Sequence, residues 1–67
     1  MGLQQLSKNL KNARTKANMT QSEVATKAKI HVNYYARIER AEENPSFEIL
    51  ENIAKALKIK LSELVDF

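Results

Sequence analysis

The chain has 67 residues and a net charge of +3, which leaves room for one small hydrophobic core but not for a catalytic cavity of its own. It contains no Cys, which excludes disulfides and thiolate metal sites, and no apolar run approaches the ~20 residues that span a bilayer. A single Gly and a single Pro among many Leu, Ile, Ala, Lys and Glu favour an all-α fold.

The charge is divided unequally along the chain. Residues 1–40 carry eight Lys and Arg against two Glu, a net charge of +6, whereas residues 41–67 carry three Lys against six acidic residues, a net charge of −3. A basic half is typical of a surface that binds a polyanion such as DNA. The alternative is that these charges are simply the solvated surface of a small helical protein.

The first predicted helix covers roughly residues 3 to 17. Apolar residues at helical spacing predict one buried stripe, formed by Leu3, Leu6, Leu10, Ala13 and Ala17. The opposite face is polar and carries Lys8, Lys11, Asn12 and Lys16. Asn18 is a suitable stop for this helix in the left-handed conformation.

The segment from Thr20 to Arg40 predicts two short helices joined by a tight turn, which is a helix-turn-helix. Thr20 followed by Glu23 forms a capping box at the start of the first of these helices. The second is expected from about Val32 to Arg40. The two helices share an apolar face formed by Val24, Ala25, Ala28, Ile30, Tyr35 and Ile38.

The other face of the second helix carries side chains that suit base edges and phosphates, namely Val32, Asn33, Tyr34 and Arg37. Asn33 can pair with adenine, Arg37 can fork to guanine or bind a phosphate, and Val32 can touch a thymine methyl group. His31, at the start of this helix, is expected to be a surface or capping residue.

Residues 41–45 form a loop, and Ser46 is expected to cap a fourth helix. The buried stripe of that helix is predicted to contain Phe47, Leu50, Ile53, Ala54 and Leu57. After a turn at residues 58–60, a fifth helix is expected from about Leu61, with Leu61 and Leu64 facing inward. We expect a single domain over residues 1–67.

Three stretches, TQSEVATKAKI, VNYYARIER and NPSFEILENIAKALKIKLSEL, follow one another in the order and spacing of the Cro/C1-type (XRE) helix-turn-helix family. The chain resembles this family, which includes phage repressors and restriction–modification controller proteins, from about Leu6 to Leu64. The resemblance implies a compact five-helix, lambda-repressor-like DNA-binding domain with the helix-turn-helix at helices 2 and 3. It implies that the start of helix 3 reads bases, that Arg14 pairs with Glu39, and that the protein is encoded by a bacterium, phage or plasmid.

The chain departs from the family pattern at its turns. Lys29, Ala41 and Lys58 stand where relatives tend to have Gly, and His31 stands where they have a Ser or Thr cap. Because a side chain in a left-handed turn costs roughly 1 kcal/mol, we expect modest stability.

Phosphate contacts are expected first from the backbone N–H of Gln21 at the start of helix 2, where the helix dipole favours an anion. Further phosphate contacts are expected from Arg40, Asn44, Ser46 and Lys27. Glu42 and Glu43 lie in the same loop and are expected to repel phosphates.

Apolar residues near the C-terminus exceed what a monomer needs to bury, and they suggest a dimer interface formed by Val65 and Phe67 with Ile49 and Ile59 as neighbours. A symmetric dimer through helix 5 would bury them and would place two recognition helices about 34 Å apart, one turn of DNA. The alternative is that these residues close their own core.

Together these features predict a homodimeric, sequence-specific regulator of transcription, most often a repressor, that binds double-stranded DNA at a near-palindromic operator. The alternative is a protein-interaction module, such as an antitoxin or a coactivator-like domain, that binds a partner protein. The exposed Val32 and Tyr34 and the acidic loop favour that alternative. One His, no Cys and no glycine-rich phosphate loop argue against an enzyme, and we expect a cytoplasmic protein without cofactor, metal or membrane contact.

Overall fold

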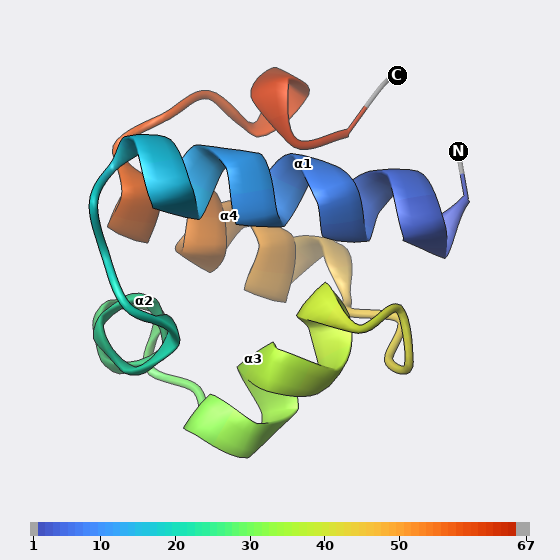
Figure 1. Ribbon diagram of the computed structural model, residues 1–67, viewed down its shortest axis with the longest axis horizontal. Helices are drawn as coiled ribbons and strands as arrows, with labels where there is room; N and C mark the ends of the chain where they lie inside the picture. The colour runs from blue at the N-terminus through green and yellow to red at the C-terminus, as the bar shows by residue number, and fades with distance from the viewer. Residues whose placement is uncertain (1, 66–67) are drawn as a thin grey trace.

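The computed structural model describes residues 2–65, which form an all-α structure without a strand (Figure 1). Its helices are α1 (Leu3–Lys16), α2 (Gln21–Ala28), α3 (Val32–Glu39), α4 (Phe47–Leu57) and a short 3-10 helix, η1 (Leu61–Glu63). This confirms the all-α class that the composition predicts. None of these helices combines the length and the apolar character that a bilayer-spanning segment requires.

The helices surround one core. α1 and α2 both pack against α3, and α2 also packs against α4, which in turn contacts η1. In Figure 1, α2 and α3 lie on one side of α1 and the η1 segment lies on the other. The fully or largely buried apolar residues come from the helices α1–α4 and from Leu64, which follows η1: Leu6, Leu10, Val24, Ala25, Ala28, Tyr35, Ile38, Leu50, Ile53, Ala54, Ala56, Leu57 and Leu64.

The predicted apolar stripes are correct in their middle and wrong at their ends. Phe47 is 57% exposed, and Leu3 and Ala17 are exposed as well. Phe47 and Leu3 are the first residues of their helices, one turn ahead of the buried Leu50 and Leu6. Periodicity places these residues on the correct face, but it cannot show where the neighbouring elements stop covering that face.

The prediction of a fifth α-helix from Leu61 is wrong. Residues 61–63 form a single 3-10 turn, in which Leu64 N donates to Leu61 O at 2.9 Å. The Glu63 carboxylate accepts a hydrogen bond from Lys60 N at 2.7 Å and so holds the start of the turn. A segment this short does not repay the cost of nucleating an α-helix, whereas the turn already buries Leu64.

Within residues 2–65, four residues other than Gly adopt the left-handed conformation: Asn18, Lys29, Ala41 and Lys58, with φ between 58° and 61°. Asn18 ends α1 as predicted. Lys29 and Lys58 end α2 and α4, where Ile30 N donates to Ala25 O and Ile59 N to Ala54 O, both at 3.0 Å. These hydrogen bonds satisfy the last carbonyls of each helix, but they place a Cβ atom where Gly is preferred.

A buried ion pair joins α1 to α3. Arg14 Nε and Nη2 donate to the two carboxylate oxygens of Glu39 at 2.7 and 3.1 Å, and Arg14 Nη1 donates to Met19 O at 3.1 Å. Gln21 Nε2 adds a third hydrogen bond to the carboxylate at 3.0 Å, and the Ser7 hydroxyl donates to the Glu39 carbonyl oxygen. The Glu39 side chain is only 1% exposed. The pair that the family resemblance implies is therefore part of a network that holds three helices together.

The network shifts the ionisation of its members. Burial raises the pKa of Glu39, but the hydrogen bonds from Arg14 and Gln21 and the neighbouring Tyr35 hydroxyl outweigh it, so the pKa lies below its usual value. Hydrogen bonding to Glu39 raises the pKa of Arg14. Burial, followed by the nearby Glu39 carboxylate, raises the pKa of Tyr35. Within residues 2–65, Tyr35 Oη is the buried side-chain polar atom without a hydrogen-bond partner of ordinary geometry.

We predict that Lys58→Gly stabilises the protein by about 0.5–1 kcal/mol, because Gly removes the Cβ strain at φ 58°. Urea unfolding followed by circular dichroism measures the change. Lys55→Gly is the matched control, since Lys55 lies within α4 and the same substitution there should destabilise by about 1 kcal/mol. Equal destabilisation by both variants would show that position 58 is not strained.

We predict that Glu39→Gln destabilises the protein by about 3 kcal/mol at pH 7, because Arg14 loses its buried partner. The folded-state pKa of Glu39 lies below its unfolded value of 4.5, so its contribution is present at neutral pH and is lost as the pH falls below 4.5. Thermal unfolding between pH 7 and pH 3 should therefore show a shallower acid decline for the variant than for the wild type. An identical decline in both would exclude Glu39 as its source.

Candidate nucleic-acid interface

The start of α2 is held by reciprocal hydrogen bonds. Thr20 Oγ1 accepts from Glu23 N at 3.0 Å, and the Glu23 carboxylate accepts from Thr20 N at 2.8 Å, as the sequence predicts. The hydrogen bonds from the Thr20 backbone and hydroxyl lower the pKa of Glu23. The helix start therefore has a defined backbone with its dipole directed outward from Gln21, a geometry that suits an anion.

Gln21 is half-buried, and its amide nitrogen is already bonded to Glu39. The side chain therefore connects α2 to the end of α3. Its backbone N–H remains the group through which this residue would contact a phosphate.

His31 caps α3. Its Nδ1 atom accepts a hydrogen bond from Asn33 N at 3.1 Å, so the His occupies the role that Ser or Thr fills in the family pattern. This is the capping role that the sequence analysis expected. The cap fixes the start of the helix that carries the predicted base-reading residues.

α3 separates its predicted base-reading residues into two groups. Asn33 and Arg37 are exposed, whereas Val32 and Tyr34 are half-buried and pack against the core. Asn33, Tyr34 and Arg37 line a shallow hollow of about 320 Å³ together with His31 and Arg40. Asn33 and Arg37 are thus the more exposed of the four predicted base-reading residues, whereas Val32 and Tyr34 present only part of their surface.

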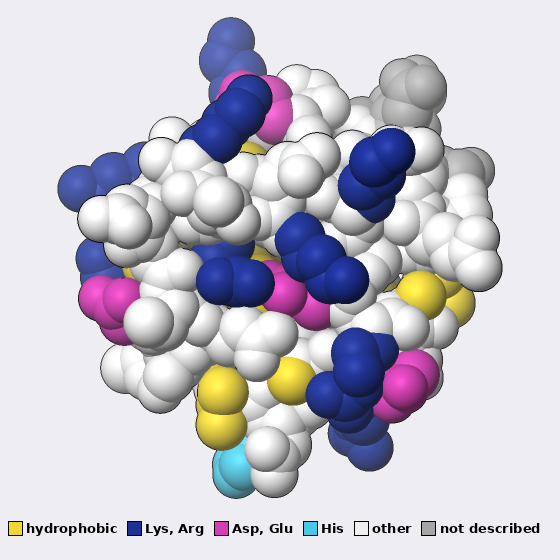
Figure 2. Space-filling model, in the orientation of Figure 1, with side chains coloured by type: hydrophobic (Ala, Val, Ile, Leu, Met, Phe, Trp, Pro, Cys, Tyr) yellow, Lys and Arg dark blue, Asp and Glu magenta, His cyan; other side chains and the backbone are white. Residues whose placement is uncertain are grey.

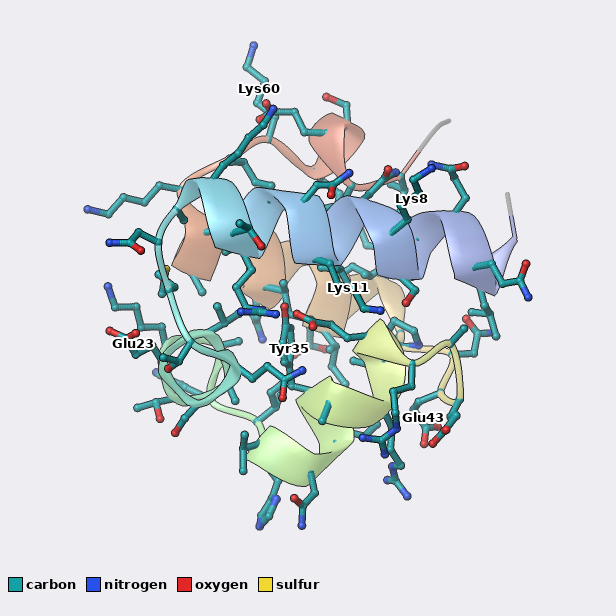
Figure 3. All side chains as sticks on the ribbon, viewed as in Figure 1. Lys8, Lys11, Glu23, Tyr35, Glu43 and Lys60 are labelled. Atoms are coloured by element: carbon teal, nitrogen blue, oxygen red, sulfur yellow. The ribbon has the colours of Figure 1, made fainter. Side chains whose placement is uncertain are left out.

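The acidic loop after α3 folds back onto that helix, because Glu42 N donates to Arg37 O at 2.8 Å. Arg37 Nη2 lies 3.4 Å from Glu43 Oε2, and its guanidinium lies 6.0 Å from the centre of the Tyr34 ring. Arg40 Nε lies 3.2 Å from Glu42 Oε1. Figure 3 shows Glu43 on the loop beside the end of α3. Each of the two arginines proposed from sequence therefore already faces a carboxylate.

The remaining predicted phosphate contacts are dispersed. Asn44 is exposed on the loop, but the Ser46 hydroxyl caps α4 by accepting from Ile49 N at 3.2 Å. Lys27 lies in the last turn of α2, at the opposite end from Gln21, in a hollow shared with Lys29. The structure does not bring Lys27 to the hollow on α3.

The predicted dimer residues lie partly in the core. Ile49, Ile59 and Val65 are half-buried and pack against the buried cluster, so each leaves part of its surface open. Phe67 lies outside the described residues.

Two lysines on α1 lie at a place that the sequence did not predict. Lys8 and Lys11 are exposed, and they line a hollow of about 300 Å³ together with Arg40 at the end of α3. Figure 2 shows Lys and Arg side chains gathered across this face, and Figure 3 places Lys11 on the side of α1 nearer to α3. Their spacing of three residues on a helix indicated a shared face, but it could not show which element lies opposite.

Comparison with known families and proteins agrees with this geometry. The model of the family HTH_3, described as helix-turn-helix, matches residues 10–64. Control protein C.BamHI from Bacillus amyloliquefaciens is 38% identical over 53 residues, which cover 79% of this chain and 65% of that protein. The immunity repressor protein of Bacillus phage phi105 is 41% identical over 56 residues, which cover 84% of this chain and 39% of that protein. The chain thus spans just under two thirds of the first relative and about two fifths of the second.

A solved structure shows the same fold. The restriction–modification controller protein C.AhdI from Aeromonas hydrophila superimposes with a TM-score of 0.91 at 27% sequence identity, covering 94% of this chain and 96% of that one. The fold of that protein thus matches nearly the whole of this chain.

Proposed function

Because this chain belongs to the helix-turn-helix family HTH_3, we propose that it binds double-stranded DNA in a sequence-specific manner and regulates transcription. The match to that family confirms the membership that the sequence motifs predict. The main support for this proposal is that Asn33 and Arg37 are exposed on α3. The capped start of α2 belongs to the same helix-turn-helix, and Lys and Arg side chains gather on this face (Figure 2).

In this proposal α3 enters the major groove, which admits one helix. Asn33 and Arg37 read base edges, and the exposed parts of Val32 and Tyr34 contact neighbouring bases or sugars. Backbone phosphates are bound by the N–H of Gln21 and by the loop residues Arg40, Asn44 and Ser46, with Lys27 at the margin. These phosphate contacts set the register of the protein but not its sequence preference.

The relatives are named as a control protein, an immunity repressor and a controller protein, which supports regulation of transcription, and repression in particular. We propose that residues 1–67 act as one DNA-binding domain that forms a homodimer on a near-palindromic operator. The partly open surfaces of Ile49, Ile59 and Val65 support an interface there, to which Phe67 would contribute.

A protein-interaction module is the second function that the sequence suggests. It is based on Val32 and Tyr34 as exposed apolar residues and on the acidic loop. The packing of Val32 and Tyr34 against the core reduces the apolar surface available to a partner protein, and the loop carboxylates of Glu42 and Glu43 face Arg40 and Arg37.

The proposal is tested by selecting random duplex DNA on the purified protein and sequencing the bound pool at two salt concentrations. We expect a two-fold symmetric motif with half-sites about one DNA turn apart, and a dimer in sedimentation experiments with the selected duplex. Recovery of no motif at either salt concentration would refute sequence-specific binding and would favour a partner protein.

We predict that Arg37→Ala weakens binding to the selected operator by roughly 1–3 kcal/mol and relaxes preference at one base position. Fluorescence anisotropy with the operator and with single-base variants measures both effects. Lys55→Ala, on α4, is the control and should retain the base preference. An unchanged preference in Arg37→Ala would remove Arg37 from the base-reading residues.

We predict that Glu42→Gln and Glu43→Gln each tighten DNA binding roughly two- to fivefold, because each frees an arginine from an intramolecular carboxylate. The gain is small since exposed ion pairs are worth only about 0.2–1 kcal/mol. Glu51→Gln on α4, an exposed carboxylate with the same charge change, is the control. Weaker binding by Glu43→Gln would instead make Glu43 a residue that positions Arg37.

A further inference from the structure

The cations on the DNA-binding face differ in whether a carboxylate already neutralises them. Arg14 Nε is 2.7 Å from Glu39, Arg40 Nε is 3.2 Å from Glu42, and Arg37 is paired with Glu43. Lys8 and Lys11 have no such partner among residues 2–65, and both are exposed. A phosphate that approaches this face can therefore bind Lys8 and Lys11 without breaking an existing ion pair.

Lys8 and Lys11 border a hollow that is lined by other polar side chains. The hollow, about 300 Å³ in volume, lies between α1 and the end of α3, and Gln4 and Asn12 add amide groups beside the lysines. Glu39 forms part of the lining, but its charge is balanced by Arg14 and its side chain is only 1% exposed. The charge that a bound anion would experience there is therefore positive.

We propose that Lys8 and Lys11 bind phosphates of the DNA backbone, so that the footprint extends from the helix-turn-helix onto α1. The inference rests on the proposed DNA-binding function and assigns part of the phosphate binding to residues outside the motif. Arg40 lies on the opposite wall of the hollow and is held by Glu42. The α1 lysines thus replace contacts that the acidic loop weakens.

DNA is the polyanion that fits this hollow, because the hollow adjoins the end of the helix whose side chains would read bases. Lys8 and Lys11 lie three residues apart and share one face of α1. Flexible ammonium groups bind phosphates as point charges without requiring a fixed geometry. Such contacts add affinity to every DNA sequence equally.

The test compares the double variant Lys8→Gln/Lys11→Gln with the wild type by fluorescence anisotropy, using the selected operator duplex and a scrambled duplex over a range of salt concentrations. We expect roughly tenfold weaker binding to both duplexes, and a slope of log affinity against log salt that is smaller by about 1 for each lysine. Lys8→Arg/Lys11→Arg should retain the wild-type slope. Thermal unfolding checks that the variants are folded.

Lys55→Gln/Lys60→Gln removes the same charge elsewhere and is the matched control; Figure 3 shows Lys60 on the side of α1 opposite to α3. If both Gln double variants bind DNA as tightly as the wild type and have the same salt slope as each other, the α1 contact is overturned and the proposed function stays intact. Loss of operator binding alone, with the scrambled duplex unaffected, would also overturn it, since phosphates are common to both. A wild type that binds neither duplex would refute the proposed function itself.

Discussion

The buried ion pair between Arg14 and Glu39 is the interaction on which the rest of this structure depends. It links the end of α1 to the end of α3, and through Gln21 it reaches the start of α2. In a chain of this size the core supplies little surplus stability. A pair of this kind fixes the angle between helices more reliably than it stabilises them, because burying two charges offsets most of their attraction. The relative placement of the two helices that would meet DNA follows from it.

Charge pairing also decides how the basic surface can be used. The sequence gives no sign that Arg37 and Arg40 would each face a carboxylate, yet the loop after α3 returns far enough for Glu43 and Glu42 to reach them. Because these pairs are largely exposed, water and salt weaken them, and a DNA phosphate can compete with them. The surface is therefore less basic at the loop than the linear charge pattern indicates, whereas Lys8 and Lys11 on α1 have no carboxylate partner among residues 2–65.

Much of the local structure could be predicted from short-range chemistry. The Thr20–Glu23 box and the Ser46 cap set the starts of α2 and α4, because a side-chain oxygen one turn ahead satisfies free backbone N–H groups. Residues Asn18, Lys29 and Lys58 end helices in the left-handed conformation. The expected fifth helix was wrong, since a 3-10 turn suffices to bury Leu64. Phe47 was wrongly placed in the core because periodicity assigns a face and not the extent of its cover.

By itself, the sequence determined the α-helical class, the caps, the helix-turn-helix and its family, because these depend on residues within one or two turns of each other and on their spacing. Only the tertiary structure decided that Val32 and Tyr34 are half-buried and that Lys8 and Lys11 border a hollow with Arg40. It also decided which arginines are paired. The burial of Val32 and Tyr34, the hollow and the Arg14–Glu39 pair depend on contacts between residues far apart in the chain, which are set by how the helices pack. The pairs of Arg37 with Glu43 and of Arg40 with Glu42 join residues close in the chain, but they depend on the backbone path of the loop after α3, which residue spacing alone does not fix.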